Sequence, residues 1–297
     1  MDVNSFLHKL GPEIDDPDEE TFLLFSQDIP SQNLGFVDSR ASKLDLTIAG
    51  KDYVINQSPT VLSSNRAGGT TGAVLWKITP MFAEWMVNPT NHLRETGILG
   101  PSSTVIELGC GISGLTGLAL APSISKYVLT DQTYVSKIVE SNLAENSGVM
   151  MSGSTGSRRK GKTSSTVRKT NLIFSPLDWE LDEVTSSLTG SDVVRSFDVI
   201  VACDCIYNDA LIRPLVQTCV DIGKLRTSDP VALQSRGPSI CIVAQQLRDP
   251  EIFEGWMKEF HERFQTWRVP GSALTDDLRS NAGFVIHVGI LRDGDRI

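Results

Sequence analysis

The sequence predicts a three-layer α/β sandwich around a mostly parallel, seven-stranded sheet. From residue 101 onward, short runs rich in β-branched residues alternate with segments that have helical periodicity, which is typical of a parallel sheet covered on both faces. The last two strand-like runs follow one another without a convincing helix between them, so we expect an antiparallel strand at one side. The chain has 297 residues, 40% of them hydrophobic, and can therefore bury a full core.

Residues 1 to 71 are predicted to form an N-terminal extension to the α/β domain, which we assign to residues 72 to 297. Within the extension, LDLTIAGKDYVINQ alternates apolar and polar residues on both sides of Gly50, which predicts a β-hairpin. Further on, Thr79 followed by Pro80 predicts a helix with a threonine N-cap and proline in its first turn.

The predicted strands and helices of the α/β domain can be read from the sequence in order. The strand-like runs are TVIEL, KYVLTD, NLIFSPLDW, FDVIVACD, SICIVAQQ, TWRVP and GFVIHVGIL. The helical candidates are SGLTGLAL, TYVSKIVESNL, ALIRPLVQTCVDI and EIFEGWMKEFHERF. The last of these has one apolar stripe at spacings of three to four residues, as expected for a helix packed against a sheet.

Residues 147 to 170 interrupt this alternation of predicted strands and helices. They are rich in Ser, Gly and Thr, contain six basic residues and no acidic one, and are predicted to form a mobile surface insertion. We favour a solvated loop for this segment, with a nuclear address or an RNA contact of RRKGK as the alternative.

The net charge limits the classes of partner. A formal charge of −9 and a pI of about 5.0 argue against a general nucleic-acid binder, which needs a basic face to replace phosphate counterions. An acidic enzyme instead suits a basic protein partner. The N-terminus lacks a signal-peptide pattern, and no stretch approaches 18 uninterrupted apolar residues. We therefore expect a soluble protein that is neither exported nor inserted in a membrane.

The five cysteines are an odd number and lie mostly in apolar segments, which favours buried, reduced thiols over disulfides. Cys203 and Cys205 are spaced C-x-C with no histidine nearby, so we predict no metal site.

The strongest local signal is TVIELGCGISGL, in which a strand leads into Gly109, Gly111 and Gly114 and then into a helix. These glycines match G-x-G-x-x-G, a pattern that allows a tight turn and a close approach of a cofactor to the backbone. Asp131, twenty residues after Gly111, ends the next strand, where its carboxylate could accept both hydroxyls of a ribose. The pattern predicts an adenosine cofactor. The alternative is that the glycines only tighten a strand-to-helix turn.

The charges near this turn distinguish between adenosine cofactors. NAD and FAD bring a pyrophosphate, whereas S-adenosylmethionine brings a cationic sulfonium and no phosphate. Glu107 lies two residues before the first glycine, Asp131 follows, and no Lys or Arg occurs between residues 101 and 125. Acidic surroundings suit a cation and oppose a diphosphate, so S-adenosylmethionine is the predicted cofactor.

Here the sequence resembles the seven-β-strand, class I, Rossmann-like methyltransferases, whose first motif appears as E-L-G-C-G. More narrowly it resembles the protein-lysine methyltransferases of the DxxY type, and within them the fungal ribosomal lysine N-methyltransferase 5 group. The blocks that carry this resemblance are VLWKITPMFAEWM, VIELGCGISGL, VLTD, SPLDW and FDVIVACDCIYNDALI, which span roughly residues 72 to 215. The DxxY pattern itself is Asp204-Cys205-Ile206-Tyr207.

The resemblance implies a role for each matched residue. Trp76 would pack near the methionine part of the cofactor, and the Gly109-Cys110-Gly111 turn would line its carboxyl-propyl end. Asp131 would hold the ribose.

On the adenine side, the resemblance implies that Trp179 flanks the base, with Asp178 as a hydrogen-bonding neighbour. Cys203, immediately before the DxxY motif, would lie under the cofactor. Taken alone, each tryptophan could equally be an ordinary core residue.

The chemistry of methyl transfer to an amine supports roles for Asp204 and Tyr207. Positive charge moves from sulfur to nitrogen during the transfer, so a carboxylate near the nitrogen stabilises the product side. Asp204 follows the fourth strand, at the edge where open α/β sheets bind ligands. Tyr207 would orient the amine or shape its channel. The alternative for Asp204 is to cap a helix that begins near Asn208 or Asp209.

We therefore expect an S-adenosylmethionine-dependent protein-lysine N-methyltransferase with a large-subunit ribosomal protein as the substrate that the resemblance implies. Its N-terminal hairpin is expected to cover the cofactor. Two other functions remain open: a nicotinamide-dependent oxidoreductase, and a non-catalytic module that binds the cofactor. We expect a monomer in the cytoplasm, with the nucleus as the alternative location, and no direct nucleic-acid readout.

Overall fold

A computed structural model of the chain describes residues 1–30, 35–64, 69–148, 171–292 and 294. Apart from positions 147 and 148, the predicted basic insertion at 147–170 lies outside these residues. No helix in the described part of the chain is long and apolar enough to cross a membrane.

All seven predicted strands form one sheet, in the order β5-β4-β3-β6-β7-β9-β8. The five parallel strands are β3 (Thr104–Leu108), β4 (Lys126–Asp131), β5 (Leu172–Pro176), β6 (Val199–Cys203) and β7 (Ile240–Gln246). The antiparallel pair is β8 (Phe264–Arg268) and β9 (Phe284–Leu291), with β9 inserted between β7 and β8. The predicted fold class is thereby confirmed.

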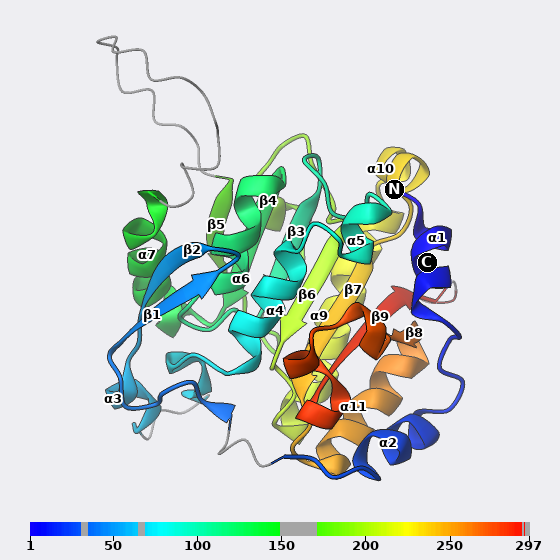
Figure 1. Ribbon diagram of the computed structural model, residues 1–297. Helices are drawn as coiled ribbons and strands as arrows, with labels where there is room; N and C mark the ends of the chain where they lie inside the picture. The colour runs from blue at the N-terminus through cyan, green and yellow to red at the C-terminus, as the bar shows by residue number, and fades with distance from the viewer. Residues whose placement is uncertain (31–34, 65–68, 149–170, 293, 295–297) are drawn as a thin grey trace.

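Helices connect the successive parallel strands (Figure 1), except between β5 and β6, where the described residues have only a short 3₁₀ turn. The α-helices of the domain are α4 (Ile78–Val87), α5 (His92–Glu95), α6 (Leu115–Leu120), α7 (Ser136–Glu145), α9 (Asp209–Thr227), α10 (Pro230–Arg236) and α11 (Pro250–Arg263). The extension adds α1 (Val3–Leu10), α2 (Pro17–Phe25) and α3 (Pro59–Leu62). Short 3₁₀ turns occur at Thr71–Ala73, Ala121–Ser123, Thr133–Val135, Ser186–Thr189, Gly271–Ala273, Asp276–Leu278 and Ser280–Ala282.

The two faces of the sheet are both covered, because successive residues of a strand point to opposite sides. Val105 of β3 belongs to a buried cluster with α4 and α6, whereas its neighbour Ile106 belongs to a second cluster with α9 and α11. Figure 1 shows α4, α6 and α7 on the near face of the sheet and α9 and α11 on the far face. The parallel strands are therefore buried on both sides, as their continuous apolar runs predicted.

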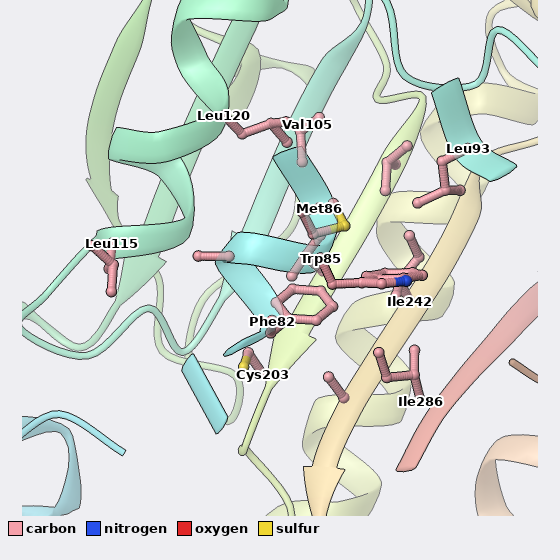
Figure 2. Close-up of a cluster of buried hydrophobic side chains, with 14 of the residues drawn as sticks. Phe82, Trp85, Met86, Leu93, Val105, Leu115, Leu120, Cys203, Ile242 and Ile286 are labelled. Carbon is pink, nitrogen blue, oxygen red and sulfur yellow. The ribbon is translucent and has the colours of Figure 1, made fainter. Parts of the chain in front are cut away.

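Helix α4 packs its apolar face directly on the sheet. Figure 2 shows Phe82, Trp85 and Met86 pointing toward β6 and β7, with Cys203 next to Phe82 at the end of β6. All three side chains are buried, and the indole Nε1 of Trp85 donates to the carbonyl of Ala273 at 2.9 Å. This packing fixes the carboxyl end of β6, where the DxxY motif begins.

The start of α4 differs from the prediction. The helix begins at Ile78, its N-cap position is Lys77, and no side chain caps it. Thr79 thus lies inside the first turn, and its backbone N–H already bonds the carbonyl of Trp76. Pro80 fits the first turn because a proline there removes no hydrogen bond that the helix needs.

The predicted hairpin is formed by β1 (Lys43–Ile48) and β2 (Lys51–Asn56). Ala49 and Gly50 connect the strands with φ angles of 49° and 73°, as a two-residue turn with both residues in the left-handed region requires. The outer edge of β2 lies against α7, where the side chains of Asn142 and Asn146 bond its backbone.

A buried ion cluster joins the amino ends of three parallel strands. Asp198, just before β6, accepts the backbone N–H of Thr104 at 2.7 Å, and its own carbonyl accepts the N–H of Ile240. Arg226 and Arg236 both donate to its Oδ1, at 2.7 and 2.6 Å. Through its carboxylate and its backbone carbonyl, Asp198 therefore ties β3, β6 and β7 to the end of α9 and to α10.

Candidate active site

A pocket of about 870 Å³ lies at the carboxyl ends of the parallel strands, the edge where open α/β sheets bind ligands. The nine site residues predicted from the sequence all line it. They are Trp76, Gly109, Cys110, Gly111, Asp131, Trp179, Cys203, Asp204 and Tyr207. Residues remote in sequence are thus brought to one place, and their individual roles remain predictions.

The glycine turn after β3 is closely packed. Gly109 and Gly111 have φ angles of 67° and 58°, which lie in the left-handed region that favours glycine. A Cβ on Gly109 would lie 2.7 Å from Sγ of Cys205 and 3.2 Å from the ring of Trp179. A Cβ on Gly111 would lie 3.2 Å from the carbonyl oxygen of Gly72. Neither position can hold a side chain unless its neighbours move.

Asp131 connects the end of β4 to this turn. Its Oδ2 accepts the backbone N–H of Gly111 at 2.9 Å, and its Oδ1 accepts the N–H of Gln132 at 2.7 Å. Burial raises the pKa of this carboxyl to about 6, although the two backbone hydrogen bonds oppose the shift. Each oxygen keeps a lone pair for a further donor, such as a ribose hydroxyl.

Glu107 is a deeply buried carboxylate that lines the pocket, with 2% of its surface exposed. The hydroxyl of Tyr127 donates to its Oε2 at 2.9 Å, a partner that the sequence analysis did not identify. Burial raises the pKa of Glu107 to about 7, against the opposing effect of that hydrogen bond. A cation bound nearby would favour the ionised form, and this property suits the sulfonium of S-adenosylmethionine.

The loop after β5 supplies Trp179, which lies beside the glycine turn. Its indole Nε1 is buried and has no hydrogen-bond partner within the described part of the chain. The neighbouring Asp178 accepts from the side-chain amide of Gln132 at 3.3 Å. A buried donor without an acceptor is costly in a protein alone, and a polar ligand in the pocket could satisfy it.

The wall opposite the sheet comes from residues 69 to 76. The hydroxyl of Thr71 donates to the hydroxyl of Tyr207 at 3.0 Å, and the indole Nε1 of Trp76 donates to the carbonyl of Thr71 at 3.1 Å. Tyr207 is 41% exposed, so its ring lies at the mouth of the pocket. Together these three residues link the wall to the DxxY segment. Thr71 and Gly72 were not identified from the sequence.

Asp204 is held in an unusual position just after β6. Its φ angle is 60°, in the left-handed region that non-glycine residues rarely adopt. Its backbone N–H bonds the carbonyl of Ala244, and its side chain is 1% exposed. Arg248 donates to both carboxylate oxygens, at 2.7 Å to Oδ1 and 2.6 Å to Oδ2. The carboxylate is therefore paired with a guanidinium before any substrate binds.

Arg248 was missed in the sequence, although it lies two residues beyond β7 at the same edge of the sheet. Its guanidinium carbon lies 5.0 Å from the ring centre of Trp76, and its Nη2 also donates to Oε1 of Gln246 at 2.8 Å. The helix-cap alternative for Asp204 is wrong, because the side chain of Asn208 caps α9 by accepting the N–H of Ala210.

Two further expectations can be compared with the structure. The hairpin does not cover the pocket, because no residue of β1 or β2 lines it. It packs on α7 instead, and the loop that follows it forms the wall. The five cysteines are all buried and unbridged, as predicted, and burial raises the pKa of the thiols of Cys203 and Cys205. No group of three or more potential metal-binding side chains occurs among the described residues.

Residues 55–239 match the model of a family described as lysine methyltransferase. The chain therefore belongs to the lysine methyltransferase family. Membership confirms the cofactor predicted from the acidic glycine motif, so the protein is an S-adenosylmethionine-dependent methyltransferase. The nicotinamide-dependent alternative is wrong, and an enzyme is favoured over a non-catalytic module.

The relatives confirm the narrower resemblance. A protein from Zygosaccharomyces rouxii named ribosomal lysine N-methyltransferase 5 is 33% identical over an alignment of 227 residues, and the match covers 70% of this chain and 70% of that protein. Proteins with the same name from other organisms also match.

A Schizosaccharomyces pombe protein named diaminohydroxyphosphoribosylamino-pyrimidine deaminase is 29% identical over 254 residues. The match covers 85% of this chain but only 53% of that protein, so the chain spans about half the length of this relative.

Among solved structures, the N-methyltransferase NodS from Bradyrhizobium japonicum, in complex with S-adenosyl-L-homocysteine, has a TM-score of 0.43. It is 11% identical, and the match covers 79% of this chain and 96% of that one.

Proposed function

We propose that this protein transfers methyl groups from S-adenosylmethionine to a lysine side chain of a large-subunit ribosomal protein. The observation that carries the substrate class is the 33% identity to a protein named ribosomal lysine N-methyltransferase 5. The negative net charge of the chain supports it, because ribosomal proteins are basic.

The pocket has the groups that such a cofactor needs. When bound, S-adenosylmethionine supplies an electrophilic methyl group on a positively charged sulfur. Glu107 offers that charge a buried carboxylate, Asp131 offers acceptors for ribose hydroxyls, and the indole of Trp179 has a donor without a partner. The glycine turn leaves space that a Cβ would fill. Trp76, Cys110 and Cys203 complete the walls.

Asp204 is proposed to bind the acceptor amine and Tyr207 to shape the mouth through which the lysine enters. Both residues line the pocket. The amine must lose a proton before it attacks, since free lysine has a pKa of about 10.4. Entry into a partly desolvated slot lowers the lysine pKa, and Asp204 accepts a hydrogen bond from the amine as its nitrogen becomes positive during transfer.

The same substrate class makes the cytoplasm the expected location and the nucleus the alternative. We expect the protein to act as a monomer on a basic protein. The division of the chain at residue 71, and the role of residues 147–170, remain predictions from the sequence.

The test is methylation of proteins extracted from purified large ribosomal subunits of cells that lack this protein. The purified chain is incubated with these proteins and with S-adenosylmethionine that carries a labelled methyl group. We expect label in a ribosomal band, and mass spectrometry should place it on lysine.

The matched control is a non-ribosomal protein fraction from the same cells, together with the Asp204→Ala variant. Label confined to the non-ribosomal fraction would overturn the ribosomal substrate and leave the lysine methyltransferase assignment intact. Label on arginine or on an N-terminus of the substrate would contradict the proposed lysine acceptor.

A further inference from the structure

The acceptor end of the pocket contains a preformed ion pair. Arg248 holds both oxygens of Asp204 in a two-pronged contact, a geometry that fixes the carboxylate plane. The Asp204 side chain is 1% exposed and the Arg248 side chain 24%. Because the pair is largely removed from water, its two charges act on neighbouring groups more strongly than a surface pair would.

The two members of the pair have different positions relative to the pocket. Asp204 lines the pocket, whereas Arg248 does not. The guanidinium instead lies against the ring of Trp76 and beside the backbone of Gly35. A Cβ on Gly35 would come within 2.5 Å of Nη2 of Arg248, so only glycine fits there. The carboxylate thus borders the pocket, and the arginine that holds it lies outside the pocket lining.

This arrangement affects the acceptor lysine through simple electrostatics. An unpaired buried carboxylate would attract the lysine as an ammonium ion and would raise the lysine pKa, which opposes the deprotonation that methyl transfer requires. A guanidinium paired with the carboxylate is always charged and offsets that attraction. The carboxylate can still accept a hydrogen bond from the amine.

We propose that Arg248 is a positioning residue that aims Asp204 at the acceptor nitrogen and offsets its negative charge, so that the lysine is held by a hydrogen bond and can still lose its proton. This inference rests on the proposed function, in which Asp204 faces the amine.

Other ionisable groups also face the acceptor site and must be kept constant in any test. Those that line the pocket are Glu107 on β3, Cys110 in the glycine turn, Asp131 and Tyr134 at and after the end of β4, Asp178 and Glu180 after β5, and Cys203, Cys205 and Tyr207 at and after the end of β6. None of them is changed in the variants below, so any shift between variants comes from the pair.

The first test uses sinefungin, a cofactor analogue with a primary amine in place of the methyl-bearing sulfonium, and needs no protein substrate. Its affinity relative to S-adenosylhomocysteine, measured by calorimetry at pH 8, reports the charge at the acceptor site. We expect this ratio to rise about tenfold in Arg248→Gln, because the carboxylate is no longer offset. The ratio should return to the parent value or below in the double variant Asp204→Asn/Arg248→Gln.

The matched control is Arg236→Gln. Arg236 also has a 24% exposed side chain and also pairs with a buried aspartate, but it lies at the amino ends of the strands. This variant should leave the ratio unchanged. An unchanged ratio in Arg248→Gln, with cofactor binding and a melting curve that show a folded protein, would overturn the inference.

The second test is the pH dependence of single-turnover methylation of the ribosomal proteins. In Arg248→Gln the rising limb of the profile should move up by about one pH unit, because the amine holds its proton more tightly. Arg248→Lys keeps the charge and loses the two-pronged contact, so its profile should stay in place with a lower maximum. A purely structural role would lower the rate of both variants without moving either profile.

The outcomes separate this inference from the proposed function. If the parent enzyme methylates no lysine, the proposed function fails, and the sinefungin ratio still decides whether Arg248 offsets Asp204. If the parent methylates and Asp204→Asn is slow, but neither the ratio nor the profile changes in Arg248→Gln, then only the role of Arg248 is wrong.

Discussion

Strand β6 has a buried aspartate paired with arginine at each end. Asp198 immediately precedes the strand and Asp204 immediately follows it. Both carboxylates are almost fully buried, and both bond an arginine at 2.7 Å or less. The chemistry of the two pairs is therefore nearly the same, and the difference lies in what surrounds them.

At the amino end, the carboxylate of Asp198 accepts hydrogen bonds from the backbone N–H of Thr104 and from two arginines. With its backbone carbonyl, which accepts the N–H of Ile240, the residue connects three strands. At the carboxyl end, Asp204 has a left-handed backbone, a single arginine partner and a place in the wall of the pocket. Backbone strain of this kind costs on the order of 1 to 3 kcal/mol and often marks a functional site. The comparison shows the same kind of ion pair at both edges of the parallel sheet: one joins strands, and the other lines the pocket, where we propose that it prepares the acceptor for reaction.

The largest expected effect is on stability at the amino end. Asp198→Ala leaves Arg226 buried without its partner and removes the acceptor for the N–H of Thr104. We expect a loss of about 3 to 5 kcal/mol in the free energy of unfolding. Denaturant titration measures it. A variant as stable as the parent would show that this cluster does not hold the strands together.

Asp204→Ala should affect activity instead of folding. The loss of one preorganised electrostatic group costs on the order of 3 to 4 kcal/mol of transition-state stabilisation, which is a hundredfold or more in single-turnover methylation. Cofactor affinity should change by only a few fold. If the variant loses as much stability as Asp198→Ala is expected to lose, or methylates at the parent rate, the contrast between the two ends is wrong.

Asp131→Ala tests a second carboxylate that lines the pocket at the carboxyl ends of the strands. It removes acceptors proposed for the ribose, and we expect S-adenosylmethionine affinity to fall by roughly 1.5 to 3 kcal/mol, measured by calorimetry. The melting temperature of the cofactor-free protein serves as the control. Equal affinity in variant and parent would remove Asp131 from the cofactor site.

Glu107→Gln should show that the buried Glu107 carboxylate, which lines the pocket at the carboxyl ends of the strands, lowers the stability of the fold at high pH. A carboxyl group whose pKa rises from 4.5 to about 7 on folding binds its proton more tightly in the folded state. Its contribution to stability is therefore full below pH 4.5 and is lost as the pH rises through 7. At pH 8 we expect the cofactor-free variant to be more stable than the parent, on the order of 2 kcal/mol.

The difference in the free energy of unfolding between Glu107→Gln and the parent should become smaller at pH 5, where the carboxyl of the folded parent is mostly protonated. The variant should also bind S-adenosylmethionine more weakly at pH 8, because it lacks the charge that we propose lies near the sulfonium. A pH-independent gap in stability would mean that Glu107 does not titrate as its burial indicates.

The smallest expected effect is that of Tyr207→Phe. The hydroxyl of Tyr207 accepts from Thr71 and lies at a partly exposed mouth, so its loss should slow methylation by only a few fold. Steady-state kinetics should show most of the change in KM. A hundredfold loss in kcat would instead place the hydroxyl at the reacting nitrogen.

The strands, the glycine turn, Asp131 and Asp204 could be predicted from the sequence, because each depends on a local pattern or on the rule that parallel strands present their carboxyl ends together. Trp76, Trp179 and Cys203 were implied by the resemblance to a known family, and no local pattern singled them out. Arg248 could not be predicted as the partner of Asp204. Their contact depends on β7 lying beside β6, and the sequence does not give the order of strands in a sheet. The same holds for the Tyr127–Glu107 contact, which requires β4 to pair with β3.

The position of the hairpin was misjudged for a related reason. Its alternating pattern predicts two strands but does not say which surface receives them. That surface is α7, whose Asn142 and Asn146 lie four residues apart on one side of the helix and match the spacing of Val54 and Asn56.

These two asparagines have a consequence for association between molecules. An exposed strand edge is a template on which another chain can add a strand. Here each asparagine amide gives one hydrogen bond to β2 and takes one from it, at distances between 2.8 and 3.1 Å. The two side chains thus satisfy the backbone N–H and C=O groups of Val54 and Asn56 that a third strand would otherwise bond. The outer edge of β2 is therefore not available for pairing with a strand of a neighbouring molecule.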